Sequence, residues 1–267
     1  MDADLASLSG ALIQSLLQGP LLLQDLPEAK TLELSSLQLP ARLPKLNAAQ
    51  KLGHLYEDAL AVLLETSPRY DLLEESLQIQ KDVHTTVGEL DFLIRDRMND
   101  ELIHLELATK FYLAVGSPEG ITLPGPDARD NYHKKLKRLR EHQLTLTQAY
   151  RHCLPECYRH EPVATRQLVY GCLFDHIQAN EQATPELANP HCRRGLWLHD
   201  SECLDYFPQH SQFQIIPKPL WPVPLEFLTG IELERWAPAQ SISRCIMVRY
   251  NDEPSPYFIA PAGYPAT

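Results

Sequence analysis

Residues 88–111 read GELDFLIRDRMNDELIHLELATKF and decide the fold that the sequence predicts. Apolar and polar residues alternate on both sides of Arg97–Glu101, a run of turn-forming residues, so the stretch predicts a β-hairpin. Residues two apart share one face of a strand. The second strand then has one apolar face and one mixed face, the latter made of His104, Glu106, Ala108 and Lys110. Asp91 on the first strand is expected to face Glu106 across the hairpin.

Two facing carboxylates repel each other unless a proton or a cation lies between them. Mg²⁺ is a natural occupant, because it is commonly held by one or two carboxylates together with waters and a substrate phosphate. It lowers the pKa of bound water and so generates a nucleophile. A nearby lysine would stabilise charge on the phosphate. Alternating polar residues also form the ordinary solvated face of a hairpin, and the sequence leaves this alternative open.

The flanking segments predict an α/β or α+β fold with a mixed β-sheet flanked by helices. Helical spacing of leucines is found in residues 3–18 and 51–64, and a third helix is expected over residues 131–150. Strands are expected over residues 70–81, 87–95 and 102–113. Short apolar runs predict that residues 155–267 are also rich in β-strands. We expect three parts: residues 1–46, a helix and an extended connection; residues 47–150, the core; and residues 151–267, a β-rich region packed on the core.

The order of these elements resembles the core of the PD-(D/E)XK nuclease superfamily. The resemblance rests on a helix with Gly53-x-x-x-Glu57, a strand with Gly88-Glu-Leu-Asp91 and a strand with Leu105-Glu106-Leu-Ala108, and it covers roughly residues 47–150. Within the superfamily, this pattern of motifs most resembles the resolvase-like and restriction-repair branches. The whole chain also resembles a bacterial family known only as a domain of unknown function, placed as a distant member of that superfamily.

The resemblance implies a restriction-endonuclease-like core in which Asp91 and Glu106 bind Mg²⁺, with Mn²⁺ as a substitute, and Glu57 is an accessory acid. The sequence departs from the superfamily at one position, because the lysine expected two residues after the second acid is Ala108. Lys110 lies on the same face of the strand, about 7 Å further along it. We therefore expect Lys110 to act as the catalytic lysine.

The predicted helix over residues 131–150 has a basic face that we expect to bind nucleic acid through Lys134, Lys135, Lys137 and Arg138. Lysines in the first turn oppose the helix dipole, and the free amides there attract phosphate, so this placement favours an anionic partner. A solvated helix face is the alternative. Gln143 lies on the inward stripe of the helix, and we expect it either to approach the active site or to make a hydrogen bond in the core.

Composition excludes several classes of protein. The share of hydrophobic residues is 44%, which is typical of a folded protein. The chain has 24 basic and 35 acidic residues, and this net charge of −11 argues against a protein that coats nucleic acid with its whole surface. No apolar run approaches the about 18 residues of a membrane span, and the acidic start does not resemble a secretory signal. We therefore expect a cytoplasmic protein without a membrane partner.

The sequence thus predicts a Mg²⁺-dependent nuclease acting on DNA rather than RNA, in repair or recombination. Two alternatives remain: a nucleic-acid-binding protein on a nuclease fold that has lost catalysis, and an interaction protein without a nucleic-acid partner, which the acidic charge favours. A resolvase-like mechanism would favour a homodimer. The sequence itself does not indicate the substrate's structure or the role of the C-terminal region.

Overall fold

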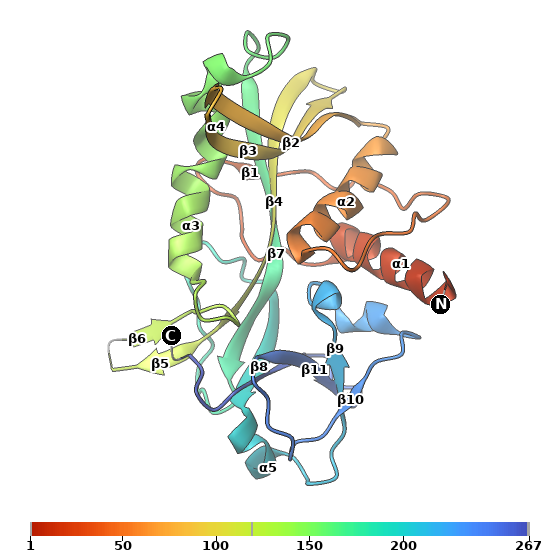
Figure 1. The fold of residues 1–267 in the computed structure, drawn as a ribbon, viewed down its shortest axis with the longest axis vertical. Coiled ribbons are helices and arrows are strands. Elements are labelled where there is room, and N and C mark those ends of the chain that lie inside the picture. The colour runs from red at the N-terminus through yellow and green to blue at the C-terminus, as the bar shows by residue number, and fades with distance from the viewer. Residues whose placement is uncertain (1, 119, 266–267) are drawn as a thin grey trace.

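The computed structural model describes residues 2–118 and 120–265, and ten of the described strands form one mixed sheet (Figure 1). The strand order is β10-β9-β11-β12-β8-β7-β4-β3-β2, and β1 pairs with β7 beside this path. Helices flank the sheet, so the predicted mixed α/β class with a large mixed sheet is confirmed. None of the described helices combines the length and the apolar character that crossing a membrane requires.

The predicted strands and the first two predicted helices occur close to their expected positions. The helices are α1 (Asp2–Gln18), α2 (Leu52–Glu65), α3 (Tyr132–Glu141), α4 (Leu146–Ala149) and α5 (Cys203–Tyr206). The strands are β1 (Lys30–Thr31), β2 (Tyr70–Asp82), β3 (Thr85–Asp96), β4 (Glu101–Leu113), β5 (Val115–Ser117), β6 (Gly120–Thr122), β7 (Val163–His176), β8 (Arg193–His199), β9 (Phe213–Ile216), β10 (Arg235–Trp236), β11 (Ile246–Tyr250) and β12 (Tyr257–Ala260).

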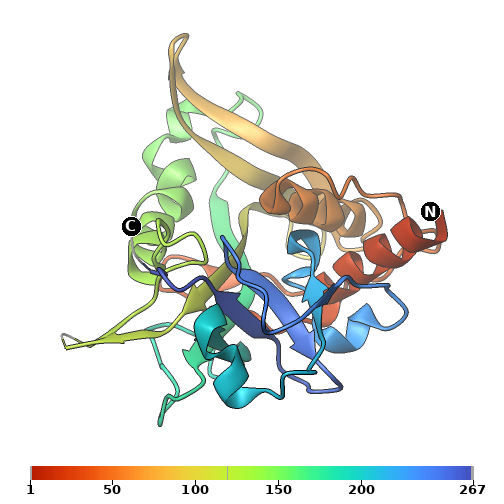
Figure 2. The same cartoon turned by 60° about the horizontal axis from the view of Figure 1, so that its bottom comes forward.

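The centre of the sheet is parallel and its two sides are antiparallel. Strand β4 runs parallel to β7 in an unbroken ladder from Leu102–Val163 to Leu113–Phe174, and β7 is parallel to β8. On one side, β3 and β2 pair antiparallel and project as a long hairpin (Figure 2). The C-terminal region supplies β7 to β12, so it belongs to the same sheet as residues 47–150.

Gly171 allows the close approach of β7 to β4. Its φ is +153°, and a Cβ at this position would lie 1.7 Å from the carbonyl oxygen of Lys110. No side chain fits there, and glycine adopts this backbone conformation without the steric penalty of other residues. The sequence therefore places a glycine where the two central strands meet beside Lys110.

Apolar residues on both faces of β4 and β7 explain why helices cover both sides. One face packs against α1 and α2, and the other against α3 and the extended segment that follows α1 (Figure 1). The first core includes Leu12, Leu16, Leu60, Leu105 and Phe111, whereas the second includes Leu22, Tyr112, Tyr132, Leu139 and Val169. The Oγ of Ser15 and the Oη of Tyr56 lie 2.6 Å apart and join α1 to α2.

The prediction of one helix over residues 131–150 is wrong. Helix α3 begins at the cap of Asn131, whose side chain accepts hydrogen bonds from two backbone amides, but it ends at Glu141. A short 3₁₀ turn follows before α4. The resulting bend lets Gln143 reach the sheet and packs Leu146 against β3, where a Cβ on Gly88 would lie 2.6 Å from a Leu146 methyl carbon. Tertiary packing thus overrides the local helical pattern.

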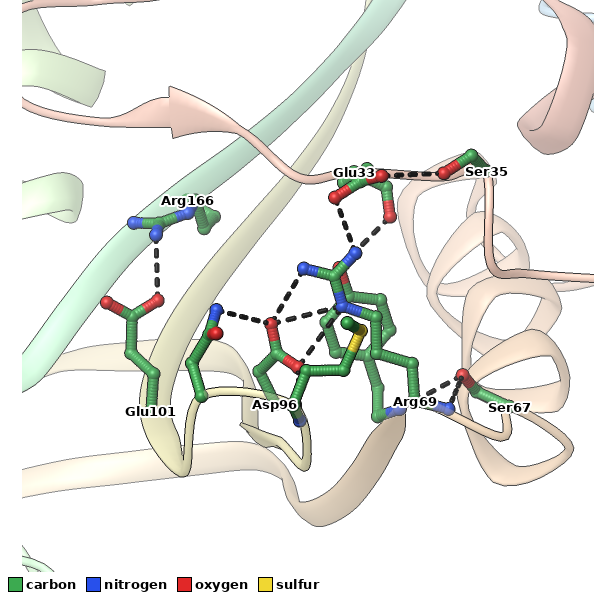
Figure 3. Close-up of polar contacts among 10 residues, drawn as sticks. Glu33, Ser35, Ser67, Arg69, Asp96, Glu101 and Arg166 are labelled. Atoms are coloured by element: carbon green, nitrogen blue, oxygen red, sulfur yellow. Dashed lines mark hydrogen bonds and ion pairs between the residues drawn. The ribbon is translucent and has the colours of Figure 1, made fainter.

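An ion-pair network fixes the turn between β3 and β4 (Figure 3). The guanidinium of Arg69 lies between Glu33, in the N-terminal extended segment, and Asp96, at the end of β3. Nε and Nη2 of Arg69 donate to the two carboxylate oxygens of Asp96, whose side chain is only 3% exposed. Nearby, Arg166 of β7 donates to Glu101 of β4 at 2.8 Å. These contacts hold the base of the hairpin against the N-terminal segment.

Candidate functional site

The candidate site lies where β3 separates from β4. The antiparallel ladder runs from the Asp96–Glu101 pair to the Phe92–Leu105 pair and ends there. The next residues along the two strands are Asp91 and Glu106, as the alternation predicted. Beyond the ladder, the backbone N–H of Leu107 donates to Oδ2 of Asp91 at 2.8 Å. A side-chain carboxylate therefore takes the position that the partner strand's backbone would occupy.

Glu106 is buried behind this point and is held at both oxygens. Its side chain is 2% exposed; Oε1 lies 2.7 Å from Nε2 of His104, and Oε2 accepts a hydrogen bond from Nε2 of Gln143 at 2.8 Å. Burial lowers the pKa of His104 to about 3, so the ring is neutral, and its Nε2 shares a hydrogen bond with Oε1 of Glu106. Gln143 thus contacts Glu106 and also lines the cavity described below.

The two carboxyl groups both have strongly raised pKa values. Burial raises the pKa of Asp91 to about 8, with a further contribution from the negative charge of Glu106, while the Leu107 amide opposes the shift. Burial also raises the pKa of Glu106 to about 8, against the hydrogen bonds from the Asp91 backbone and Gln143. Such a pair is costly when both groups are ionised, and a proton or a cation between them removes the cost.

A cavity of about 1060 Å³ opens in front of Asp91. It lies along β4 beyond the end of the β3 ladder and is bordered by α2, by α3 and by the β9 and β11 segments. Glu106 does not reach its surface. The predicted site residues that line the cavity are Glu57, Asp91, Lys110, Lys135, Arg138 and Gln143. Lys134 and Lys137 are exposed on α3 outside the cavity, and Lys137 pairs with Glu141.

Lys110 faces the cavity on the side of Asp130. Its Nζ lies 3.7 Å from Oδ2 of Asp130, and burial lowers the pKa of its ammonium group. Ala108, at the superfamily's lysine position, also lines the cavity. The lysine predicted to stand in for Ala108 is therefore in the same cavity as Asp91 and is paired with a different carboxylate.

Glu57 borders the cavity from α2. Its Oε2 lies 2.8 Å from Nδ1 of His54, and this contact raises the pKa of His54. The negative charge of Glu57 contributes to the raised pKa values of both Asp91 and Glu106. Three acids thus act on one another electrostatically at this end of the cavity.

A metal at this site would depend on oxygen donors besides protein side chains. Within residues 2–118 and 120–265, no group of three His, Cys, Asp or Glu side chains is close enough to hold an ion together. The Asp91 and Glu106 pair still suits Mg²⁺, which keeps several waters and usually takes only one or two protein carboxylates. The chemistry of the donor set fits a hard divalent cation and not a zinc site of nitrogen and sulfur ligands.

Sequence reasoning missed three basic residues of the cavity. Lys51 precedes α2, Lys218 follows β9, and Arg244 precedes β11, yet all three line the same cavity as Asp91. No local pattern marks them, since they belong to separate loops that only the folded sheet brings together.

Comparison with known proteins gives one result. Neither the curated proteins nor the solved structures include a significant match to this chain. The model of a family described as a domain of unknown function (DUF1853) matches residues 12–262, nearly the whole sequence, and the chain belongs to that family.

Proposed function

We propose that this protein hydrolyses phosphodiester bonds in DNA with the help of Mg²⁺. The observation that carries the proposal is the pair of buried acids, Asp91 and Glu106, at the point where two strands separate beside a large cavity. Two buried carboxyl groups with pKa values near 8 have no evident benefit for stability. They are readily explained as ligands for a cation that neutralises both.

The arrangement of elements supports a restriction-endonuclease-like core. Helix α2, the antiparallel strands β3 and β4 and helix α3 follow one another in the order expected from the PD-(D/E)XK resemblance. The acids lie on these two strands and Glu57 on the first helix, as in the motif order of that superfamily.

Each residue then has a definite role. Asp91 and Glu106 would hold Mg²⁺, which when bound would activate water and neutralise phosphate charge. His104 and Gln143 fix the carboxylate of Glu106 from two sides. Glu57 adds negative charge at the edge of the site.

The remaining site residues are cations. The ammonium of Lys110, which lines the same cavity, would stabilise negative charge on the substrate. Lys135 and Arg138 of α3 would bind phosphates of the nucleic acid backbone on the way into the site.

One observation favours a second candidate, a nucleic-acid-binding protein without catalysis. Ala108 replaces the superfamily's lysine, and Lys110 pairs with Asp130. In this second candidate, the cavity would bind nucleic acid through Lys135 and Arg138, and Mg²⁺ would have no effect.

A cleavage assay separates the two candidates. The protein is incubated with Mg²⁺ or Mn²⁺ and labelled single-stranded, duplex and branched DNA and RNA, beside Asp91→Asn, Glu106→Gln and the exposed control Asp205→Asn. We expect metal-dependent cleavage that falls by roughly 100-fold or more in the first two variants and is unchanged in the control. Salt-sensitive binding without cleavage would favour the second candidate, and cleavage that survives both substitutions would contradict the proposed site.

A further inference from the structure

Five of the cations that line the cavity have no carboxylate partner among the described residues. Among the described residues, the side chains of Lys51, Lys135, Arg138 and Arg244 make no hydrogen bond or ion pair, and Lys218 lies over the ring of Trp221 with its Nζ 5.7 Å from the ring centre. These five residues come from four separate segments: the start of α2, helix α3, the turn after β9 and the loop before β11.

Several arginines elsewhere in the fold are neutralised by carboxylates. Seven arginines that do not line the cavity form ion pairs with carboxylates, namely Arg69, Arg95, Arg97, Arg129, Arg140, Arg166 and Arg194. On α3 the contrast is direct, because Arg140 pairs with Glu28 at 2.7 Å whereas Arg138, which lines the cavity, has no such partner. With 11 more acidic than basic residues in the chain, carboxylates are not scarce. Unpaired cations gathered around one cavity therefore indicate an anionic ligand.

The C-terminal strands supply one wall of this cavity. Lys218 and Arg244 are exposed at its border, while Ile215 and Ile246, on β9 and β11, are partly exposed apolar residues that also line it. Strands β9 and β11 pair with each other, with Met247 opposite Ile216, so this wall is continuous. Cations beside apolar surface are the combination that binds the phosphates and bases of a flexible strand.

The size of the cavity discriminates between forms of nucleic acid. A volume of 1060 Å³ equals that of a sphere about 13 Å across, whereas the two grooves of B-DNA are about 8.5 and 7.5 Å deep, which makes a duplex at least about 16 Å across. A duplex is therefore too wide to enter as far as Asp91. A single strand of a few nucleotides is narrow enough to enter, and the cations that line the cavity can contact its phosphates.

We propose that the cavity takes a single-stranded segment of nucleic acid, and that Lys218 and Arg244 make the C-terminal strands the second wall that grips it opposite α3. The inference rests on the proposed function for the identity of the anion as a polynucleotide. It adds the substrate's strandedness and a role for the C-terminal region.

Binding in EDTA tests the inference without catalysis. Fluorescence anisotropy compares a labelled single-stranded oligonucleotide, as DNA and as RNA, with a blunt duplex of the same sequence. The variants are Lys218→Ala/Arg244→Ala and the charge-matched control Arg42→Ala/Lys81→Ala, whose exposed residues lie outside the cavity. We expect tighter binding of the single strand than of the duplex. The cavity variant should weaken it by about tenfold and reduce the slope of log K against log salt by roughly 1.4, about 0.7 for each lost phosphate contact.

The outcomes distinguish this inference from the proposed function. Equal binding of duplex and single strand, or equal effects of the two double variants, would overturn the inference even if Mg²⁺-dependent cleavage is observed. Selective single-strand binding that depends on Lys218 and Arg244 supports the inference even if no substrate is cleaved. Preference for RNA over DNA would keep the single-strand site and change only the sugar that it accepts.

Discussion

Replacing Asp91 with asparagine should stabilise the metal-free protein. The asparagine side chain has almost the same shape and its carbonyl oxygen can still accept the hydrogen bond from Leu107, but it carries no charge near Glu106. The pKa of Asp91 is about 8 in the folded protein and about 3.9 in an unfolded chain. Asp91 must therefore take up a proton when the chain folds at pH 7, which is about 3 pH units above its pKa in the unfolded chain. This protonation costs about 4 kcal/mol at 1.36 kcal/mol per unit.

The pH dependence of the effect follows from its sign. A carboxyl group whose pKa is raised by folding binds more protons in the folded state, so the wild type loses stability as pH rises from about 4 to about 8. The gain from Asp91→Asn should be near zero at pH 4 and reach about 2 to 4 kcal/mol at pH 7 to 8. For a chain of this size, that gain raises Tm by roughly 5 to 10 °C.

Thermal or urea unfolding at pH 4, 6 and 8, with EDTA or with Mg²⁺, measures this effect. Mg²⁺ at about 100 times its Kd should stabilise the wild type at pH 8 by about 2.7 kcal/mol and leave Asp91→Asn unchanged. The exposed Asp205→Asn serves as the control and should behave as the wild type. A variant less stable than the wild type at pH 8 in EDTA, or one that Mg²⁺ still stabilises, would refute the reasoning.

Three further substitutions have defined outcomes. Arg69→Met leaves the buried carboxylate of Asp96 without its partner and should lower the free energy of unfolding by about 3 kcal/mol at pH 7. Because Arg69 lowers the pKa of Asp96, this loss should become smaller when urea unfolding is measured at lower pH. A loss that does not change with pH would contradict the prediction. Gly171→Ala forces a Cβ against the carbonyl of Lys110 and should reduce the yield of folded protein or lower Tm sharply. If the variant melted like the wild type, the contact between β4 and β7 would be looser than described. Lys110→Met should reduce cleavage by roughly 100-fold without loss of Tm. The control Lys81→Ala, exposed on β2 outside the cavity, should leave cleavage unchanged, and equal rates in both variants would exclude Lys110 from catalysis.

The hairpin at the centre of the site was predictable because its information is local. Alternation of apolar and polar residues requires only a strand and a turn, so Asp91 and Glu106 could be expected at adjacent positions of β3 and β4. The same pattern could not reveal that the ladder ends just before these residues. That feature depends on the Asp91 carboxylate accepting the Leu107 amide and on the course of the β2 and β3 hairpin.

The parts that escaped prediction depend on distant contacts. Helical spacing continues past Glu141, but α3 ends there because Gln143 binds Glu106 and Leu146 packs on Gly88, both remote in sequence. Lys218 and Arg244 join the cavity only through the pairing of β9 with β11. Isolated basic residues in loops rich in proline and serine give no signal of their own.

Crystals soaked in Mn²⁺ provide the most direct measurement of whether Asp91 and Glu106 bind one divalent cation. Anomalous scattering locates the ion independently of any activity. We expect a single Mn²⁺ peak about 2.2 Å from a carboxylate oxygen of each residue, with water completing the coordination. A peak elsewhere in the cavity, or no peak while Gln143 and His104 still hold Glu106, would contradict the proposed metal site.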